Sequence, residues 1–413
     1  MRYYGNVTRS QQKRSRKYRW LFLVIIIIVV LLVCLFFYES RKNNKSATEG
    51  SNGVNANNQA TEQIQDFDTV KAKYLFSGTV VPARAVENEA RKSDGSIDYN
   101  QPFSKLDTFN PSQYDAWTID NECAITDANI PYRQQVTNTV FNCRPEFLPA
   151  MKKYFTVLNF ANNHVYDQGS DKFPQMQKYA QDAGFQFLGN QNPAETKDVC
   201  EVMSMKVHLN KKDGSSTEGS LPIAFCAWHY FERQPYPGEF DVMKKYAEIM
   251  PVVGLMQVGQ EYVAKAGSDQ EFVGRSIIDG GAEFVIGNSP HWVQNSDVYK
   301  NKLIFYSTGN FIFDQLDKET NRGASIEVNM KIKYDENVAK WLTLGDKCKT
   351  HYDDCLKLAQ DLKLKKIKPT FTYGLVASTT GYKQLTQKAD SVTQQEVEER
   401  ANWQETLKKL GQR

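Results

Sequence analysis

The sequence FANNHVYDQG, residues 160–169, follows a short apolar run and places one imidazole among amide and carboxyl side chains. An amide oxygen can ligate a metal, and an adjacent imidazole can act as a general acid or steer a phosphoryl oxygen. Asp167 stands where it can hold the tautomer of His164. The alternative is that the Asn and Asp residues only cap the helix that follows. Both interpretations remain open from this stretch alone.

Short apolar runs alternate with amphipathic segments on both sides of this stretch, which predicts an α/β fold. Asn, Asp, His and Gly residues cluster just after the predicted strands, where open α/β sheets place their sites. A helix is predicted over Asp171–Ala183, with Gly184 as its stop signal. Another is predicted over Ser391–Leu410, with Ser391 as its cap.

Three other stretches combine an apolar run with polar residues. In an extended segment Asp120 and Glu122 point to the same side, which suits half of a divalent-metal site; a plain acidic loop is the alternative. The sequence GNSPHWVQ, residues 287–294, presents His291 in a turn fixed by proline, unless that histidine is simply solvated. The sequence YSTGNFIFD, residues 306–314, places Asn310 in a turn, and a plain strand–turn–strand is the alternative.

Together and in this order, these stretches resemble the CapA family, named for poly-γ-glutamate capsule synthesis. The resemblance extends from about Tyr74 to Tyr334 and rests most on FANNHVYDQG, GGAEFVIGNSPHWVQ (residues 280–294) and IFYSTGNFIFD (residues 304–314). It implies a calcineurin-like metallophosphoesterase fold, a four-layer αββα sandwich. It also implies a two-metal site at the strand ends.

The chain departs from the family pattern at three implied metal-ligand positions. Thr79 stands in place of an aspartate, and Gln257 and Ser289 each stand in place of a histidine. Such a site loses most of its affinity for transition metals.

The ligands that the resemblance leaves are Asp120, Glu122, Asn163 and His291. The implied catalytic residues are His164 and Asp167, and the other site-lining residues are Arg84, Asn162, Glu261 and Asn310. Four ligands suit one divalent cation (Mn²⁺, Mg²⁺, Ca²⁺ or Zn²⁺) or none, rather than a two-metal clamp.

A transmembrane helix is predicted over residues 20–38, which are apolar or aromatic apart from one cysteine. These 19 residues, at about 1.5 Å each, can cross a hydrocarbon core about 30 Å thick. Basic residues without acidic ones precede the segment, so the N-terminus is expected in the cytoplasm and the main domain outside it. A cleaved signal peptide is the alternative, but the run is long and no small-residue cleavage site follows.

The predicted organisation has five parts: a basic cytoplasmic tail (1–19), the membrane helix (20–38), a flexible linker (39–70), a CapA-like domain (71–335) and a C-terminal extension packed on it (336–413). The linker is rich in Asn, Ser, Gln and Lys and cannot bury enough apolar area to fold. The net charge of +3 includes seven positive charges in the tail, so the remainder is mildly acidic. Nothing in it suggests nucleic-acid binding.

Six cysteines follow the membrane segment, and an even number outside the cytoplasm permits disulfides. The simplest pairing is sequential: Cys123 with Cys143, Cys200 with Cys226 and Cys348 with Cys355. None has the CxxC spacing of a zinc site. Free buried cysteines are the alternative.

Three functions remain open from the sequence. The first is a membrane-anchored protein that assists the synthesis, export or surface attachment of an anionic capsule-type polymer, with that polymer or a synthase or export complex as partner. The second is a metal-dependent hydrolase of phosphoester or polymer amide bonds, in which His164 protonates the leaving group. The third is a surface adhesin or carbohydrate-binding module, for which no sequence feature argues specifically.

Overall fold

The computed structural model describes residues 67–192, 199–230, 238–348 and 352–412. The predicted tail, the membrane segment and nearly all of the predicted linker lie outside these residues. Within the described ranges, no helix is both long and apolar enough to cross a membrane.

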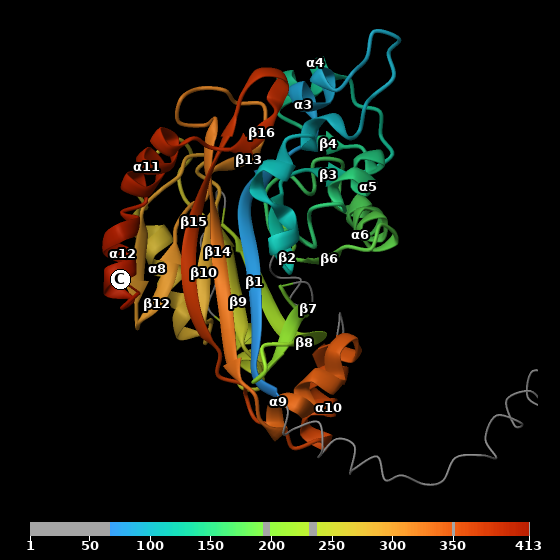
Figure 1. Ribbon diagram of the computed structural model, residues 1–413. Coiled ribbons are helices and arrows are strands. Elements are labelled where there is room, and N and C mark those ends of the chain that lie inside the picture. Colours follow the sequence, from blue (N-terminus) through green and yellow to red (C-terminus); the bar gives the residue numbers. More distant parts are fainter. Residues whose placement is uncertain (1–66, 193–198, 231–237, 349–351, 413) are drawn as a thin grey trace, which may run out of the picture. The chain divides into compact units, whose positions relative to one another are not determined.

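The long strand β1 (Phe67–Val80) organises the fold (Figure 1). It begins at Phe67, so residues 67–70, predicted as the end of the linker, belong to the sheet. Its first part pairs with β7 (Cys200–Lys211), and from Tyr74 onward it pairs in parallel with β2 (Ala116–Asn121). On its other side it pairs with β14 (Arg322–Lys333) and then β13 (Asn310–Ile312). We call the place where β1 leaves β7 for β2 the fork.

The strands form one large branched sheet. Its main path runs β11–β12–β10–β9–β8–β7–β1–β14–β15–β16, and β2, β5 and β6 branch from β1. The remaining bounds in the main path are β8 (Ser216–His229), β9 (Val252–Gln257), β10 (Phe284–Asn288), β11 (Ser296–Tyr299), β12 (Lys302–Phe305), β15 (Thr370–Thr380) and β16 (Thr386–Lys388). The branch continues through β5 (Val157–Asn159) and β6 (Gln186–Leu188), while β3 (Ala124–Ile125) and β4 (Asn142–Cys143) pair separately.

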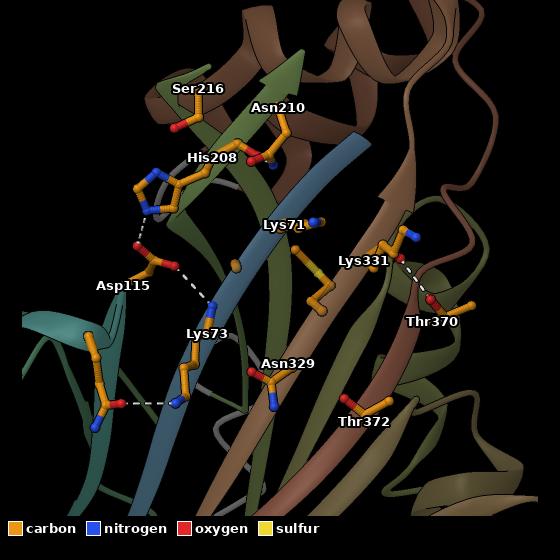
Figure 2. Close-up of a pocket in the computed structure, with 13 residues that line it drawn as sticks. Lys71, Lys73, Asp115, His208, Asn210, Ser216, Asn329, Lys331, Thr370 and Thr372 are labelled. Atoms are coloured by element: carbon orange, nitrogen blue, oxygen red, sulfur yellow. Dashed lines mark hydrogen bonds and ion pairs between the residues drawn. The ribbon is translucent and has the colours of Figure 1, made fainter. Parts of the chain in front are cut away.

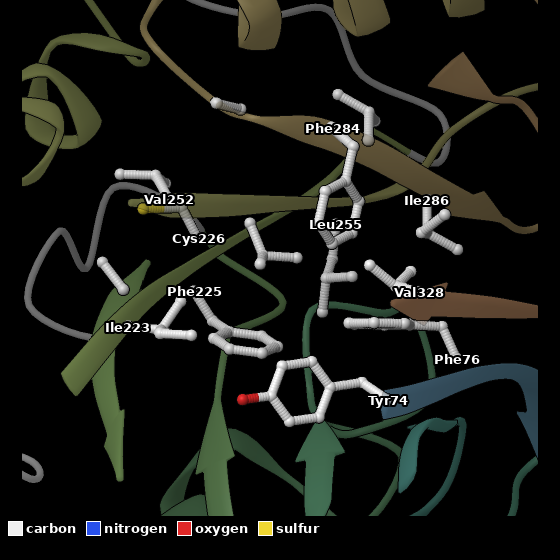
Figure 3. Close-up of a cluster of buried hydrophobic side chains, with 14 of the residues drawn as sticks. Tyr74, Phe76, Ile223, Phe225, Cys226, Val252, Leu255, Phe284, Ile286 and Val328 are labelled. Carbon is white, nitrogen blue, oxygen red and sulfur yellow. The ribbon is translucent and has the colours of Figure 1, made fainter. Parts of the chain in front are cut away.

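The sheet folds over so that β1, β14 and β15 face β8, β9 and β10 across an aromatic core (Figure 3). The ring of Phe76 lies 6.1 Å from that of Phe225 and 5.5 Å from that of Phe284. Phe284 in turn meets Phe371 at 5.3 Å. Aromatic pairs of this kind add roughly 0.5–1.5 kcal/mol each beyond their burial. A second core around Trp117 lies on the other side of β1.

The described residues contain ten α-helices. They are α3 (Arg84–Glu89), α4 (Tyr132–Asn138), α5 (Leu148–Met151), α6 (Phe173–Asp182), α7 (Asp241–Ala247), α8 (Ser268–Asp279), α9 (Glu336–Leu344), α10 (Tyr352–Asp361), α11 (Ser391–Arg400) and α12 (Trp403–Lys409). Figure 1 shows α3 to α6 gathered beside β2 and β6, and α11 and α12 at the opposite edge. The α/β class is therefore confirmed as a mixed α/β fold with one large sheet.

The C-terminal segment joins the same sheet, because β15 pairs with β14 from Arg322 to Lys331. The single helix predicted over Ser391–Leu410 is wrong. Asn402 adopts a left-handed conformation (φ 51°) and divides it into α11 and α12. The predicted cap is also wrong, since Asp390 and not Ser391 accepts the backbone N–H of Thr393, at 2.8 Å.

All three predicted disulfides are confirmed: Cys123–Cys143, Cys200–Cys226 and Cys348–Cys355. Cys200 and Cys226 lie directly opposite each other on β7 and β8. Cys123 follows Glu122 immediately, so its bond ties the segment after β2 to β4.

Candidate functional site

Strand register brings the predicted site residues to one edge of the sheet. Thr79 on β1 lies opposite Asp120 on β2 and Asn310 on β13, and Asp120 lies opposite Asn159 on β5. On the facing half of the sheet, Gln257 at the end of β9 lies opposite Asn288 at the end of β10. Parallel strands that end together bring residues far apart in the sequence into one site.

Asp120 is buried within a ring of side-chain amides. Four amide nitrogens donate to its carboxyl oxygens, namely those of Asn288 (2.9 Å), Asn162 (3.2 Å), Asn159 (3.4 Å) and Gln257 (3.5 Å). Burial, followed by the charge of Glu122, raises the pKa of Asp120 to about 8, although hydrogen bonds from Asn288 and Asn162 oppose the shift. Burial therefore favours the protonated form of Asp120.

Glu122 is joined to this ring by Thr79. The Thr79 hydroxyl donates to Glu122 Oε2 at 2.7 Å and accepts from Asn288 Nδ2 at 2.6 Å. Thr79, Asp120 and Glu122 are all buried. Thr79, which replaces an implied carboxylate ligand, thus contacts Glu122 directly and is connected to Asp120 through Asn288.

His291 enters the site from a tight turn at the end of β10. Ser289 and His291 flank Pro290 with φ values of 115° and 58°, in the region that side chains other than glycine rarely adopt. His291 Nδ1 donates to Asn310 Oδ1 at 2.8 Å, and Nε2 lies 3.7 Å from Glu261 Oε1. Burial alone would lower the pKa of His291, but the charge of Glu122 and interactions with Glu261 and Asn310 raise it to about 9. The imidazole is therefore cationic at neutral pH.

His164 and Asp167 form a second pair in the loop after β5. His164 Nδ1 lies 2.7 Å from Asp167 Oδ2, which also accepts the backbone N–H of Phe141 at 2.6 Å. The ring of His164 stacks on Phe141 with 3.9 Å between centroids. The arrangement predicted from sequence, in which Asp167 orients this imidazole, is present.

Arg84 lies beside both histidines through shared aromatic neighbours. Its guanidinium lies 4.8 Å from the ring centre of Phe141 and 5.5 Å from that of Phe313, which stacks on His291. Arg84 Nε forms an ion pair with Asp314 Oδ2 at 3.0 Å. The motif ending at Asp314 therefore anchors the arginine.

Ser289 and Asn163 are not part of the ring around Asp120. Ser289 Oγ is directed to the carbonyl of Gly259 at 3.5 Å. Asn163 is half-buried and makes no side-chain hydrogen bond within the described part of the chain, whereas Asn162 makes three. Its assignment as a ligand stays a prediction.

The sequence reasoning missed Asn159 and Asn288. Each is the last residue of a buried strand, in the runs VLN (157–159) and FVIGN (284–288). A lone polar residue closing an apolar strand was the available signal. The contact between Asn288 and Asp120 could not be predicted from local sequence, because the two residues are 168 positions apart.

The donor set does not fit the divalent metal that the family resemblance implies. Amide N–H groups and a hydroxyl, rather than further anionic ligands, face the carboxyl pair. Among the residues whose structure is described, no group of three or more His, Cys, Asp or Glu side chains could hold a metal ion. A cavity of about 20 Å³ beside Asp120, lined also by Thr118 and Asn288, has room for about one water molecule. The imidazole of His291, whose pKa is raised chiefly by Glu122, carries positive charge beside this carboxyl pair.

Two proteins similar in sequence to this chain are named for capsule biosynthesis. The chain is 29% identical over 217 residues to "Capsule biosynthesis protein CapA" of Bacillus anthracis, covering 48% of this chain and 50% of that protein. It is 26% identical over 287 residues to "PGA biosynthesis protein CapA" of Bacillus subtilis, covering 66% of this chain and 71% of that one. The match thus spans only half the length of the first relative.

Among solved structures, a Staphylococcus aureus protein described as a 5′-nucleotidase aligns with 81% of this chain and 58% of its own, at 9% identity and a TM-score of 0.37. The model of the family "Bacterial capsule synthesis protein PGA_cap" matches residues 73–315. That match covers 243 of the 413 residues, including every strand end described above. The chain is therefore a member of the bacterial capsule synthesis protein PGA_cap family.

Proposed function

We propose that this protein assists the synthesis, export or surface attachment of an anionic, poly-γ-glutamate-like capsule polymer, and that its strand-end site does not depend on a divalent metal. Family membership supports the capsule role. The observation that carries the second part is the ring of amides and hydroxyl around Asp120 and Glu122. A two-metal hydrolase would place anionic or imidazole ligands there.

The hydrogen-bond ring around Asp120 suits a structural role at the strand ends. Each donor to Asp120 comes from a different strand end or loop, so the ring fastens β2, β5, β9 and β10 together. Arg84 and the cationic His291 add positive charge near these loops. Such a network can hold the loops at the strand ends in place without a metal ion.

We also infer that the domain is extracytoplasmic and tethered by the apolar segment at residues 20–38. The three buried disulfides support this placement, since structural disulfides persist in oxidising compartments. The basic residues before the segment support a cytoplasmic N-terminus. We take the two facing halves of the folded sheet, with helices outside them, as the implied four-layer αββα sandwich.

A capsule-producing host that lacks this chain tests the capsule role. We expect the full-length chain to restore surface polymer, and a His164→Ala variant to restore it equally. Full-length protein purified in detergent should contain no stoichiometric metal. Stoichiometric metal together with loss of polymer in the His164→Ala variant would overturn the metal-independent part of the proposal, and unaltered capsule in the host without the chain would overturn the capsule role.

The His164–Asp167 pair favours one second candidate, a hydrolase. A buried imidazole held by a carboxylate at 2.7 Å is an arrangement that can deliver a proton to a leaving group. Release of soluble fragments from the polymer by purified wild-type protein, and no release by the His164→Ala variant, would select this candidate. Intact polymer in both samples would exclude it.

A further inference from the structure

A pocket of about 530 Å³ lies at the fork, away from the strand-end site (Figure 2). Its walls come from β1, β7, β14 and β15, from the start of β8, and from the segment that leads into β2. Lys71 in this pocket and Thr79 in the strand-end site are eight residues apart on β1, or roughly 26 Å at about 3.3 Å per residue. The pocket lies toward the N-terminal end of β1.

Basic side chains from three neighbouring strands meet in one row of this pocket. Lys71 on β1 lies directly opposite Lys331 on β14 and, on its other side, opposite His208 on β7. Directly opposite residues project from the same face of a sheet, and like charges placed so are destabilising. Figure 2 shows the three side chains on their adjoining strands. Stability therefore does not explain the pair of lysines.

Neither Lys71 nor Lys331 has an acidic partner within salt-bridge distance in the described part of the chain. Other lysines of the sheet are neutralised: Lys73 Nζ lies 3.0 Å from Glu327, and Lys302 Nζ lies 3.2 Å from Glu283. Both Lys71 and Lys331 are exposed, so an incoming anion can reach them.

The one carboxylate that lines the pocket is already engaged. Asp115 Oδ1 lies 2.7 Å from His208 Nε2, and Asp115 Oδ2 accepts the backbone N–H of Lys73 at 2.9 Å. Lys73 is paired with Glu327 and His208 with Asp115, so the unpaired charged residues of the lining are Lys71 and Lys331. The pocket therefore presents excess positive charge.

We propose that this fork pocket binds a carboxylate-bearing polyamide chain. Lys71 and Lys331 pair with the carboxylates, and the neutral side chains of Asn329, Thr370 and Thr372 can hydrogen-bond amide groups between them. Phosphate recognition commonly uses Arg forks or helix N-termini, and the described lining has neither. The volume lies within the range of small-ligand pockets. The inference rests on the proposed function for the identity of the polymer.

Binding of poly-γ-glutamate oligomers to the full-length protein in detergent tests the inference. A Lys71→Gln/Lys331→Gln variant should bind at least about tenfold more weakly, because two charged contacts are lost. Its melting temperature should be equal to or above that of the wild type, since a like-charge pair is removed. The matched control is Lys178→Gln/Lys340→Gln, which removes the same charge from two lysines paired elsewhere, with Asp182 and Glu336.

Unchanged affinity in the fork variant, or an equal loss in the control, would overturn the inference. Displacement of the oligomers by inorganic phosphate more readily than by free glutamate would also overturn it, as would a preference for anionic lipid vesicles. The outcomes separate the two proposals. If the fork variant loses oligomer binding but a host without the chain still makes normal capsule, the capsule role alone is refuted. If a host without the chain loses its capsule but the fork variant binds the oligomers as well as the wild type does, the pocket proposal alone is refuted.

Discussion

Thr79 Oγ1 donates a hydrogen bond of 2.7 Å to Glu122 Oε2, linking the strand that organises the sheet to the acidic segment after β2. The same hydroxyl accepts from Asn288, which also donates to Asp120. The residue that stands in place of an implied ligand thus links Glu122 to Asn288, and through Asn288 to Asp120, in a buried hydrogen-bond network. A network of this kind is costly to leave partly satisfied.

Removal of the Thr79 hydroxyl should therefore destabilise the folded state. In Thr79→Val the shape is kept but Glu122 and Asn288 each lose a partner, so we expect a loss of about 1–3 kcal/mol in the free energy of unfolding. Urea denaturation of the purified full-length protein measures it. Thr79→Ser keeps the hydroxyl and should lose less. Equal losses in the two variants would show that the methyl group, not the hydrogen bond, matters.

A divalent-cation site should be recoverable by restoring two implied ligands. The double variant Thr79→Asp/Gln257→His places a carboxylate and an imidazole beside Asp120 and Glu122. Thr79 already contacts Glu122, and Gln257 already contacts Asp120. Without metal we expect a lower melting temperature than wild type, because another buried acid is added. With Mn²⁺ the melting temperature should rise in the variant and stay constant in the wild type. A Mn²⁺-dependent rise in the wild type would contradict the metal-independent site.

Stability should fall as the pH rises from about 6.5 to about 9. The pKa of Asp120 is raised by burial and by Glu122 to about 8, and that of His291 is raised, chiefly by Glu122 against the effect of burial, to about 9. Unfolded Asp and His titrate near 3.9 and 6.5, so in this window the folded state binds more protons than the unfolded state. Both contributions are complete below the unfolded pKa values and are lost above the folded ones. Melting curves across this pH range measure the slope, and Asp120→Asn should make it shallower. A slope of the opposite sign would refute the assignment.

The disulfide Cys123–Cys143 should stabilise the segment that carries Glu122. It closes a loop across 20 residues of sequence, which in the chain-entropy account is worth roughly 3 kcal/mol. Cys123→Ser/Cys143→Ser should lower the melting temperature and increase amide exchange between residues 123 and 143. Cys348→Ser/Cys355→Ser, whose bond closes a loop across only 7 residues, should have the smaller effect. An equal or larger effect at the shorter loop would argue against the entropic explanation.

Reversal of one charge in the fork pocket should stabilise the fold while weakening ligand binding. Lys71→Glu places a carboxylate directly opposite Lys331, and replacing a like-charge pair by an opposite one should add roughly 0.2–1 kcal/mol of stability. The same change should weaken binding of poly-γ-glutamate oligomers more than Lys71→Gln does. Thermal melts and binding isotherms on one preparation measure both. Reduced stability in Lys71→Glu would contradict the like-charge relationship.

Local sequence signals predicted much of this protein. The sequential disulfide pairing, the simplest of the arrangements that the sequence left open, is the one in the structure. Polar residues at the ends of apolar runs indicated Asp120, His164 and His291. Local signals failed where one residue's conformation overrode a regular pattern. Asn402 breaks the last helix although the apolar face continues past it, because its left-handed backbone cannot propagate a right-handed helix.

The sequence by itself determined the α/β class, the membership of a capsule-synthesis family and the types of residue available at the strand ends, because periodicity and motif composition are properties of neighbouring residues. Only the tertiary structure decided which of those residues meet. Asn288 faces Asp120 across 168 residues of sequence, and Lys71 lies between Lys331 and His208 through pairings with two different strands. Those contacts depend on strand register and on the fork in the sheet, and register is set by packing of the whole core rather than by any local stretch.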